Sequence, residues 1–372
     1  MQLPDTFIRY TREMLGEEHF ERLMAALDEK PPVSIRLNPD KCAGLTLATE
    51  ADHVPWCPEG YYLSSRPPFT FDPLLHAGCY YVQEASSMFI THVLRQLTCL
   101  PVAMLDLCAA PGGKTTAALT ALPSGSRLWA NEPVRQRAQV LSENLQKWGA
   151  PACTVTCQQA HDFQRQEMLF DVVLCDVPCS GEGMFRKDPG AVEEWSPQNV
   201  EKCWRLQRKI VTDIWPCLKP GGLMVYSTCT LNTKENEENV RWICQEMGAK
   251  MLSVDIRPEW GILGSMLDGF DAPVYRFIPG FTRGEGLFMA AMRKTPPPTV
   301  ELAYPQAVAY LQHQALQLPE GTPLGLVEVT FMGKRLGMVK NVGNRANNLY
   351  PQEWRIKSTH TPNDYEAILR HP

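Results

Sequence analysis

The chain has 372 residues, of which 44% are hydrophobic and 21% charged, and its formal net charge is −5. That length predicts two or three domains with a sizeable core, and no apolar run approaches the roughly 18 residues that a membrane span needs. The negative charge excludes a uniformly basic nucleic-acid binder, so a phosphate-binding surface would have to be local.

The N-terminus and the cysteines predict the compartment. The first ten residues lack the basic flank and apolar core of a secretory signal, so we expect a cytoplasmic protein. The 13 cysteines are odd in number and include no CxxC pair. We therefore expect reduced thiols, mostly in the core, and no metal site. A catalytic cysteine has to be found from its surroundings.

The first predicted element is helical. Apolar residues recur at helical spacing over residues 5–29, with Gly16 as a break, and the pattern stops at Pro31 and Pro32. From residue 33 to about residue 73, short apolar pieces alternate with prolines and turns, which is typical of a small α+β unit. We therefore assign residues 1–78 to an N-terminal α+β domain.

Strand and helix patterns alternate over residues 79–294, which predicts a Rossmann-like, doubly wound α/β sheet. The predicted strands span residues 102–107, 127–131, 170–175, 222–227 and 287–292. The predicted helices span residues 115–122, 133–148 and 197–218. The last helix is followed by the stop signal Lys219-Pro220-Gly221-Gly222.

Three consecutive prolines, Pro296 to Pro298, predict a linker over residues 295–299. Residues 300–372 then form a small third domain, with a predicted helix over 305–316 and strands over 325–330 and 337–340. Its segment 331–357 holds six cations, Lys340 and Arg345 among them, against one acid. This local excess of positive charge indicates either an RNA-docking surface or an ordinary solvated face.

A glycine-rich loop joins the first central strand to a helix. It reads Asp106-Leu107-Cys108-Ala109-Ala110-Pro111-Gly112-Gly113-Lys114-Thr115. A strand that turns through glycines into a helix lets backbone N–H groups approach a ligand. Glu132, at the end of the next predicted strand, can accept hydrogen bonds from both hydroxyls of a ribose. A P-loop is the rival interpretation, but its first glycine would fall on Cys108. Loop and acid together indicate a nucleoside cofactor.

Two aspartates and two cysteines follow later strands. Asp162 follows the third strand region, where it can hold an adenine amino group or merely cap a loop, and Asp176 ends the fourth strand. Cys179 comes three residues after Asp176, and Cys229 follows the strand over residues 222–227. If these two strands are neighbours in the sheet, both thiols lie at the same carboxyl edge as the cofactor loop.

Such an edge suits methylation of a pyrimidine at carbon 5. That carbon is not nucleophilic enough to take a methyl group unaided, so a thiolate must first add to carbon 6. A base must later remove the carbon 5 proton, for which the second cysteine is a candidate, and Asp176 is placed as an acid near N3. The chemistry leaves open whether Cys179 or Cys229 attacks, and each cysteine taken singly is more typical of a core position. Lys114 is one possible source of the positive charge that lowers a thiol pKa.

Two short patterns point to other enzymes. Asp176-Val177-Pro178-Cys179 differs from the Asp-Pro-Pro-Tyr loop of amine methyltransferases, because it lacks the aromatic residue that stacks on the base. Glu238-Asn239-Val240 spells a tripeptide of DNA cytosine-5 methyltransferases. It lies in a charged run over residues 233–241, which predicts a solvated helix face.

Three segments together resemble the signature motifs of the RNA cytosine-5 methyltransferases, in particular the bacterial branch that modifies 16S ribosomal RNA. They are residues 106–115, residues 176–183 and Ser227-Thr228-Cys229. Residues 81–88 are similar to the family's lead into the catalytic domain, and Arg186-Lys187-Asp188 to its continuation of the second motif. Residues 339–351 resemble the PUA-like RNA-binding end of that branch. The chain is shorter than that branch between residue 294 and the helix near residue 305.

The resemblance implies an S-adenosylmethionine-dependent enzyme that forms 5-methylcytosine in ribosomal RNA. It implies cofactor contacts from Cys108, Ala109, Ala110, Pro111, Gly112, Gly113, Lys114, Glu132, Asp162 and Asp176. The resemblance makes Cys229 the nucleophile and Cys179 the residue that assists release of the product. Analogy with the DNA cytosine-5 methyltransferases, whose nucleophile follows a proline, favours the reverse assignment. We expect RNA contacts from Lys187, Lys340 and Arg345, with 16S rRNA or the small ribosomal subunit as the partner, no membrane or metal, and a monomer.

Three alternatives stay open at this point. The substrate can be tRNA rather than rRNA, or the enzyme can methylate an amine without covalent catalysis. The chain can also be a catalytically silent RNA-binding protein, although such a protein has no need of both cysteines.

Overall fold

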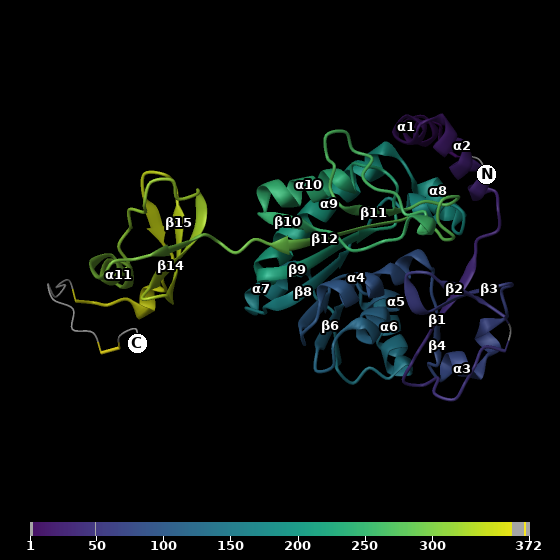
Figure 1. The fold of residues 1–372 in the computed structure, drawn as a ribbon, viewed down its shortest axis with the longest axis horizontal. Helices are drawn as coiled ribbons and strands as arrows, with labels where there is room; N and C mark the ends of the chain where they lie inside the picture. Colours follow the sequence, from purple (N-terminus) through teal and green to yellow (C-terminus); the bar gives the residue numbers. More distant parts are fainter. Residues whose placement is uncertain (1–2, 49, 359–367, 370–372) are drawn as a thin grey trace. The chain divides into compact units, whose positions relative to one another are not determined.

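The computed structural model describes residues 3–48, 50–358 and 368–369 (Figure 1). The chain divides into two compact units, Met1–Thr295 and Pro296–Pro372. In the part of the chain that is described, no helix is both long enough and apolar enough to cross a membrane. All thirteen cysteines are free thiols, as expected.

Two helices open the first unit, α1 (Asp5–Leu15) and α2 (Glu17–Leu27). Gly16 separates them with a φ of +73°, a left-handed conformation that favours glycine. The predicted break is therefore confirmed. Phe7 of α1 packs edge to face on Phe185 and Trp195, so this helix is held against the segment that follows Cys179.

An antiparallel sheet of four strands follows, in the order β2-β3-β1-β4. Its elements are β1 (Val33–Leu37), β2 (Asp52–Val54), β3 (Cys57–Leu63), η1 (Phe69–Phe71), α3 (Pro73–His76) and β4 (Tyr80–Val82). This is the predicted small α+β domain. Its last strand lies just beyond residue 78, where the sequence placed the end of the domain, and completes the sheet by pairing with β1.

The large sheet has the strand order β10-β12-β9-β8-β5-β6-β7, with β11 beside β12. Its strands are β5 (Ala103–Asp106), β6 (Arg127–Asn131), β7 (Cys153–Thr156), β8 (Phe170–Asp176), β9 (Leu218–Thr228), β10 (Ala249–Leu252), β11 (Val274–Phe277) and β12 (Leu287–Lys294). β9, β8, β5, β6 and β7 run parallel, whereas β10 and β11 pair antiparallel with β12, and β12 with β9. The predicted α/β sheet is confirmed with all five of the strands whose ranges were predicted, and β7, β10 and β11 are additional.

Helices of this unit cover both faces of the large sheet (Figure 1). The helices and 3-10 turns between β4 and β11 are η2 (Ser86–Met88), α4 (Phe89–Leu97), α5 (Gly113–Ala121), α6 (Arg135–Trp148), α7 (Ala160–Arg165), η3 (Glu182–Met184), α8 (Pro189–Glu194), α9 (Pro197–Ile214), η4 (Trp215–Cys217), α10 (Glu237–Glu246) and η5 (Pro258–Trp260). α4, α5 and α6 contribute to one apolar core, and α7, α9 and α10 to another. The alternating residues Met104 and Leu105 of β5 belong to the two different cores, as expected for a strand with two buried faces.

The helix α9 ends earlier than predicted. It stops at Ile214 rather than residue 218, because Pro216 in the following turn has no N–H to donate. The stop signal that begins at Lys219 is not a separate turn but the start of β9, where the register against β8 is irregular.

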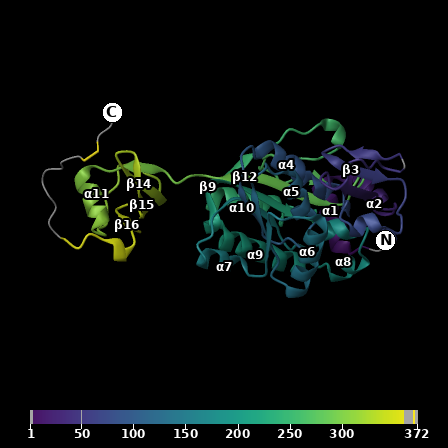
Figure 2. The same ribbon diagram turned by 90° about the horizontal axis from the view of Figure 1, so that it is seen from below.

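The second unit has its own sheet and core (Figure 2). The strand order is β13-β14-β15-β16. The elements are β13 (Thr299–Glu301), α11 (Tyr304–Leu311), β14 (Gly325–Phe331), β15 (Lys334–Asn341), β16 (Ala346–Asn348) and η6 (Gln352–Trp354). Tyr310 of α11 is buried in one cluster with Val327 and Val329 of β14 and Val339 of β15. The predicted helix and both strands are confirmed, although the helix ends at Leu311 rather than at residue 316.

Candidate active site

Three parallel strands bring the predicted site residues to one edge of the large sheet. β5 pairs with β8, and β8 with β9, so that Asp106 lies opposite Leu174 and Asp176 opposite Ser227. The loops that leave the carboxyl ends of these strands are therefore neighbours. The strand adjacency on which the cysteine hypothesis depends is confirmed.

The thiols of Cys179 and Cys229 are in direct contact, with their Sγ atoms 3.1 Å apart. The hydrogen bond from the Cys179 thiol lowers the pKa of Cys229; burial opposes this effect and the charge of Lys114 adds to it. The same hydrogen bond, together with burial, raises the pKa of Cys179. The pair therefore favours a thiolate on Cys229 and a protonated thiol on Cys179.

Lys114 and Asp176 form an ion pair beside the thiols, with 2.8 Å between Nζ and Oδ2. Lys114 stands in the first turn of α5, and Asp176 ends β8. Burial alone would lower the pKa of Lys114, but Asp176 and Cys229 raise it above its usual value. The ammonium group is thus retained, and it is a source of positive charge for the Cys229 sulfur.

A buried carboxylate, Glu235, joins the two cysteine loops. It accepts hydrogen bonds from the backbone N–H of Ser180 at 3.0 Å, from Gln207 Nε2 at 2.7 Å and from Asn232 Nδ2 at 2.8 Å. Burial raises the pKa of Glu235 to about 7, and these hydrogen bonds oppose that rise. Because Ser180 belongs to one cysteine loop and Asn232 to the other, Glu235 holds the two loops together.

A second buried carboxylate, Glu182, makes a similar link. It accepts hydrogen bonds from the backbone N–H groups of Leu231 at 2.9 Å and Asn232 at 2.8 Å, and from Trp195 Nε1 at 2.9 Å. The hydroxyl of Tyr10 in α1 also donates to it. Glu182 therefore connects one cysteine loop to the other and to the N-terminal helix.

Glu182→Gln is expected to lower the free energy of unfolding by about 1–3 kcal/mol. Both carboxylate oxygens accept from N–H donors, so either orientation of the amide places its NH₂ group against a donor. Urea unfolding followed by tryptophan fluorescence measures the change. Glu246→Gln, at an exposed position of α10, is the matched control and should change stability by less than about 0.5 kcal/mol. Equal stability of both variants would contradict the linking role.

The run over residues 233–241, predicted to be a solvated helix face, is mostly buried, and that prediction is wrong. Glu237 and Asn239 are both almost inaccessible. Glu237 forms an ion pair with the buried Arg276, and Asn239 donates to Gln207 Oε1 at 2.8 Å. A charged run looks solvated in the sequence because the partners that satisfy it come from distant elements, here β11 and α9.

The cofactor loop adopts a conformation that favours glycine. Gly112 has a φ of +111° and directly precedes α5, which starts at Gly113, two residues before the predicted helix. The loop carbonyls are fixed from outside, since the Tyr81 hydroxyl donates to Pro111 O at 3.1 Å and Arg137 donates to Ala110 O at 3.1 Å. The first N–H groups of a helix have no partner within it, so those of α5 can donate to a ligand.

Arg36 of β1 supports this loop from the N-terminal sheet. Its buried guanidinium donates to Gln83 Oε1 at 2.7 Å and to Thr116 Oγ1 of α5 at 2.5 Å, and it lies 4.5 Å from the ring centre of Trp148. Burial lowers the pKa of Arg36 to about 10. Arg36 thereby couples the N-terminal sheet to the helix that follows the loop.

Two buried carboxylates at this edge each have an oxygen without a hydrogen bond from any residue that the structure describes: Glu132 Oε2 and Asp106 Oδ1. Glu132 Oε2 has one ion-pair contact, with Arg137 Nη1 at 3.4 Å. The other Glu132 oxygen accepts the N–H of Val134 at 3.0 Å, and burial raises the pKa of Asp106 to about 7. A buried polar atom without a partner costs about 1–3 kcal/mol. Ribose hydroxyls over Glu132 would remove that cost, so the residues present fit a nucleoside cofactor.

Four predicted site residues remain to be placed: Asp162, Lys187, Lys340 and Arg345. Asp162 stands in the first turn of α7, where its carboxylate accepts a backbone N–H as a cap at 3.0 Å, so the capping role that the sequence left open is present. Lys187 lies 3.7 Å from the buried Glu285. Lys340 and Arg345 belong to the second unit, where both are exposed.

Sequence reasoning missed Glu182, Glu235 and Arg36. Glu182 lies inside the segment 176–183 that carries a motif, so an acid next to a candidate catalytic cysteine was a usable signal. The sequence around Glu235 and Arg36 offered no such signal, because their burial depends on residues that are distant in the chain.

Family models match three consecutive parts of the chain. The model described as 16S rRNA methyltransferase RsmB/F matches residues 101–293. The N-terminal domain of 16S rRNA methyltransferase RsmF matches residues 3–85, and the methyltransferase RsmF PUA domain matches residues 297–356.

Individual proteins with similar sequences have names that match these family descriptions. Ribosomal RNA small subunit methyltransferase F of Pectobacterium atrosepticum is 33% identical over 310 residues, and that of Cronobacter sakazakii is 33% identical over 313 residues. The matches cover 79% of this chain and 63% of each relative, so the chain spans less than two thirds of their length. Solved structures with the same fold include NSun6 from Pyrococcus horikoshii with SFG, with a TM-score of 0.65, 21% identity, and coverage of 78% of this chain and 98% of that one. A methyltransferase homolog protein from Pyrococcus horikoshii has a TM-score of 0.64, 24% identity, and coverage of 78% and 100%.

Proposed function

The chain belongs to the 16S rRNA methyltransferase RsmB/F family, and from that premise we propose that it is an S-adenosylmethionine-dependent RNA methyltransferase that forms 5-methylcytosine. The observation that carries this proposal is the 3.1 Å contact between the thiols of Cys179 and Cys229, next to the ion pair of Lys114 and Asp176. Neither an amine methyltransferase without covalent catalysis nor a silent RNA-binding protein has a use for two thiols in contact at this edge.

In this proposal Cys229 is the nucleophile. Its lowered pKa increases the thiolate fraction at neutral pH. The thiolate adds to carbon 6 of cytosine, and the electrons of the carbon 5–carbon 6 double bond become available at carbon 5. Bound S-adenosylmethionine supplies the methyl group that carbon 5 takes up.

Asp176 and Cys179 are assigned the proton transfers at N3 and carbon 5 of the base. Asp176, at the end of β8, is placed to pass a proton to N3 of the base while the thiolate adds and to take that proton back when the thiolate leaves. The hydrogen bond that raises the pKa of Cys179 is lost once Cys229 is bonded to carbon. Cys179 can then lose its proton to solvent and, as a thiolate, accept the carbon 5 proton. The electrons of the carbon 5–hydrogen bond re-form the carbon 5–carbon 6 double bond, the bond between sulfur and carbon 6 breaks, and the Cys229 thiolate leaves.

The cofactor residues are proposed from the loop and its neighbours. The segment from Cys108 through Gly112 to Lys114 would lie along the cofactor, Glu132 would accept from its ribose hydroxyls, and Asp162 and Asp176 would contact the remainder. The buried Oε2 of Glu132, which accepts no hydrogen bond from any described residue, supports this arrangement. For Asp162, an adenine contact would have to use the oxygen that does not cap α7.

Glu132→Ala is expected to weaken binding of S-adenosylhomocysteine by about 10- to 100-fold, the cost of losing hydrogen bonds to an ionised acceptor. Isothermal titration calorimetry measures the dissociation constant without any need for RNA. Glu143→Ala, at an exposed position of α6, should leave it unchanged. An unchanged constant in Glu132→Ala would remove this residue from the cofactor site.

The proposed substrate is 16S rRNA or the small ribosomal subunit. The relatives' names favour ribosomal RNA over tRNA. The second unit, which matches a PUA domain, presents the exposed cations Lys340 and Arg345 as candidate RNA contacts.

Bisulfite sequencing of ribosomal and transfer RNA, from cells with and without the gene, tests the proposal. We expect one or more cytosines of 16S rRNA to lose 5-methylation when the gene is absent and to regain it on complementation. Loss of 5-methylation confined to tRNA would identify tRNA rather than rRNA as the substrate. No loss in any RNA, together with purified protein that transfers no methyl group to cytosine, would refute the function.

A further inference from the structure

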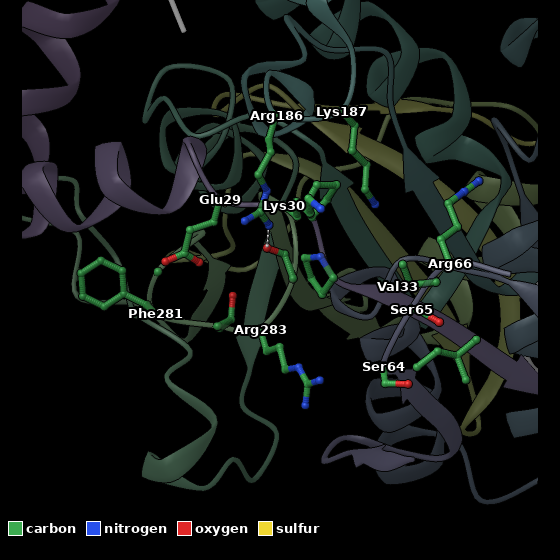
Figure 3. A pocket seen from close by; sticks show the side chains of 16 residues that line it. Glu29, Lys30, Val33, Ser64, Ser65, Arg66, Arg186, Lys187, Phe281 and Arg283 are labelled. Atoms are coloured by element: carbon green, nitrogen blue, oxygen red, sulfur yellow. Dashed lines mark hydrogen bonds between the residues drawn. The ribbon is translucent and has the colours of Figure 1, made fainter. Parts of the chain in front are cut away.

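A basic cleft of about 1160 Å³ opens between the N-terminal domain and the loops of the large sheet (Figure 3). Figure 3 shows Lys187 at the top, Arg66 at the right and Arg283 at the bottom of this cleft. One carboxylate, Glu29, lines it. Its cations are Lys30, Arg66, Arg186, Lys187 and Arg283. Among the lining residues alone this is an excess of four positive charges, in a chain whose net charge is −5. Two carboxylates behind the lining offset part of it, since Glu285 pairs with Arg186 and Lys187, and Asp52 pairs with Arg283.

Several of these cations are available to a ligand. Lys30 and Arg66 are exposed and form no ion pair with any residue that the structure describes. The Arg283 side chain is 51% exposed, and its only carboxylate contact among the described residues is with the exposed Asp52 at 2.5 Å. Arg186, by contrast, is buried and used internally, since it donates to Gly284 O at 2.8 Å and pairs with a buried glutamate.

Backbone hydrogen bonds connect one wall of the cleft to the segment that carries Cys229. The N–H of Gly183 donates to the carbonyl of Cys229 at 2.8 Å, and the N–H of Gly286 lies 3.3 Å from Gly183 O. A Cβ atom at Gly183 would come within 2.4 Å of Gly286 O, so glycine is required where these two segments meet. Gly284, two residues earlier, lines the cleft. The lining segment that contains Gly284 is therefore a near neighbour of the loop that carries Cys229.

The geometry points to a site in this cleft for the sugar-phosphate backbone of single-stranded RNA next to the target cytosine, an inference that rests on the proposed function. Phosphates are the groups that lysine and arginine bind in RNA, and the hydroxyls of Ser64 and Ser65 line the same space. The volume exceeds that of common small-molecule pockets. The strand is single-stranded or locally unpaired here, because a base that reaches a thiol must leave its stack.

This site makes the first unit an RNA-binding surface in its own right. Lys30, Arg66 and Arg283 would place the strand relative to the thiols, whatever Lys340 and Arg345 of the second unit contribute. The N-terminal domain is then part of the substrate site, because Lys30 and Arg66 belong to it.

The test compares the full chain with the triple variant Lys30→Gln/Arg66→Gln/Arg283→Gln, by fluorescence anisotropy with a short labelled single-stranded RNA of mixed sequence. Loss of three phosphate contacts should weaken binding about 100-fold at 0.1 M salt and reduce the slope of log K against log salt by about 2. Methylation of 16S rRNA transcript should show a raised KM for RNA. The cofactor dissociation constant should not change.

The control Arg127→Gln/Lys147→Gln/Lys250→Gln removes three exposed cations at the start of β6, the end of α6 and on β10. It should bind RNA nearly as the parent does. Unchanged RNA affinity in the cleft variant would overturn the proposed site. An equal loss of affinity in the control would show that the loss reflects net charge rather than a site in the cleft. Both outcomes are independent of the proposed function, which fails only if the parent transfers no methyl group to cytosine.

Discussion

Cys229→Ser is expected to reduce methyl transfer by roughly 10⁴-fold or more, the scale of loss when a covalent nucleophile is removed. A serine hydroxyl at neutral pH is not ionised, whereas the hydrogen bond from Cys179 and the charge of Lys114 favour the thiolate at this position. The parent should form a denaturant-stable adduct with RNA that contains 5-fluorocytidine, because fluorine cannot leave as a proton does, and the variant should form none. Transfer of labelled methyl groups and denaturing gel electrophoresis measure the two effects.

Cys99→Ser, at an exposed cysteine, serves as the control and should keep both activity and the adduct. Cofactor affinity of Cys229→Ser should match that of the parent, which separates a lost nucleophile from a misfolded site. An active parent that forms no adduct would refute covalent catalysis. Substantial activity in Cys229→Ser would favour the amine methyltransferase alternative.

Cys179→Ala is expected to trap the protein on unmodified RNA. The variant removes the thiol that lies 3.1 Å from the Cys229 sulfur and that is proposed to take the carbon 5 proton, so the methylated adduct should accumulate. Loss of a proton-transfer group reduces turnover by about 10²- to 10⁴-fold. The measurement is the fraction of protein that migrates with RNA under denaturing conditions, in the presence of S-adenosylmethionine.

The double variant Cys179→Ala/Cys229→Ser should show no trapping, because the adduct needs the Cys229 sulfur. Trapping that persists in the double variant would assign the covalent bond to another residue. Rapid, clean turnover by Cys179→Ala would refute its role in release. If instead Cys179→Ala formed no adduct and Cys229→Ser did, the roles of the two cysteines would be reversed.

The sheet and the placement of the thiols were predictable because their signals are local. β6 coincides with its predicted range and β8 extends it by one residue, since buried parallel strands read as short apolar runs. The turn at Gly112 needs a left-handed conformation that glycine favours, and that need is visible in the sequence. Once β8 and β9 are placed side by side, the positions of Cys179 and Cys229 follow from the chain.

The polar interior of the site could not be predicted in the same way. Glu182, Glu235 and Glu237 look like solvated acids in the sequence, and their burial depends on donors from α1, α9 and β11. Arg36 is 80 residues from Thr116, its partner in α5. The choice of Cys229 as nucleophile came from resemblance alone, and the unequal pKa directions of the two thiols now supply a physical argument for it.

The guanidinium of Arg36 bears on any attempt to make a smaller enzyme. A fragment that began at residue 79 would keep the large sheet and the cofactor loop but would leave Thr116 without the cation that donates to it, and would uncover the face of Trp148 on which the cation lies. The shortest useful fragment of this unit therefore has to begin before β1. Truncation from the N-terminal side would impair the methyl-donor site before it reached a single residue of the cofactor loop.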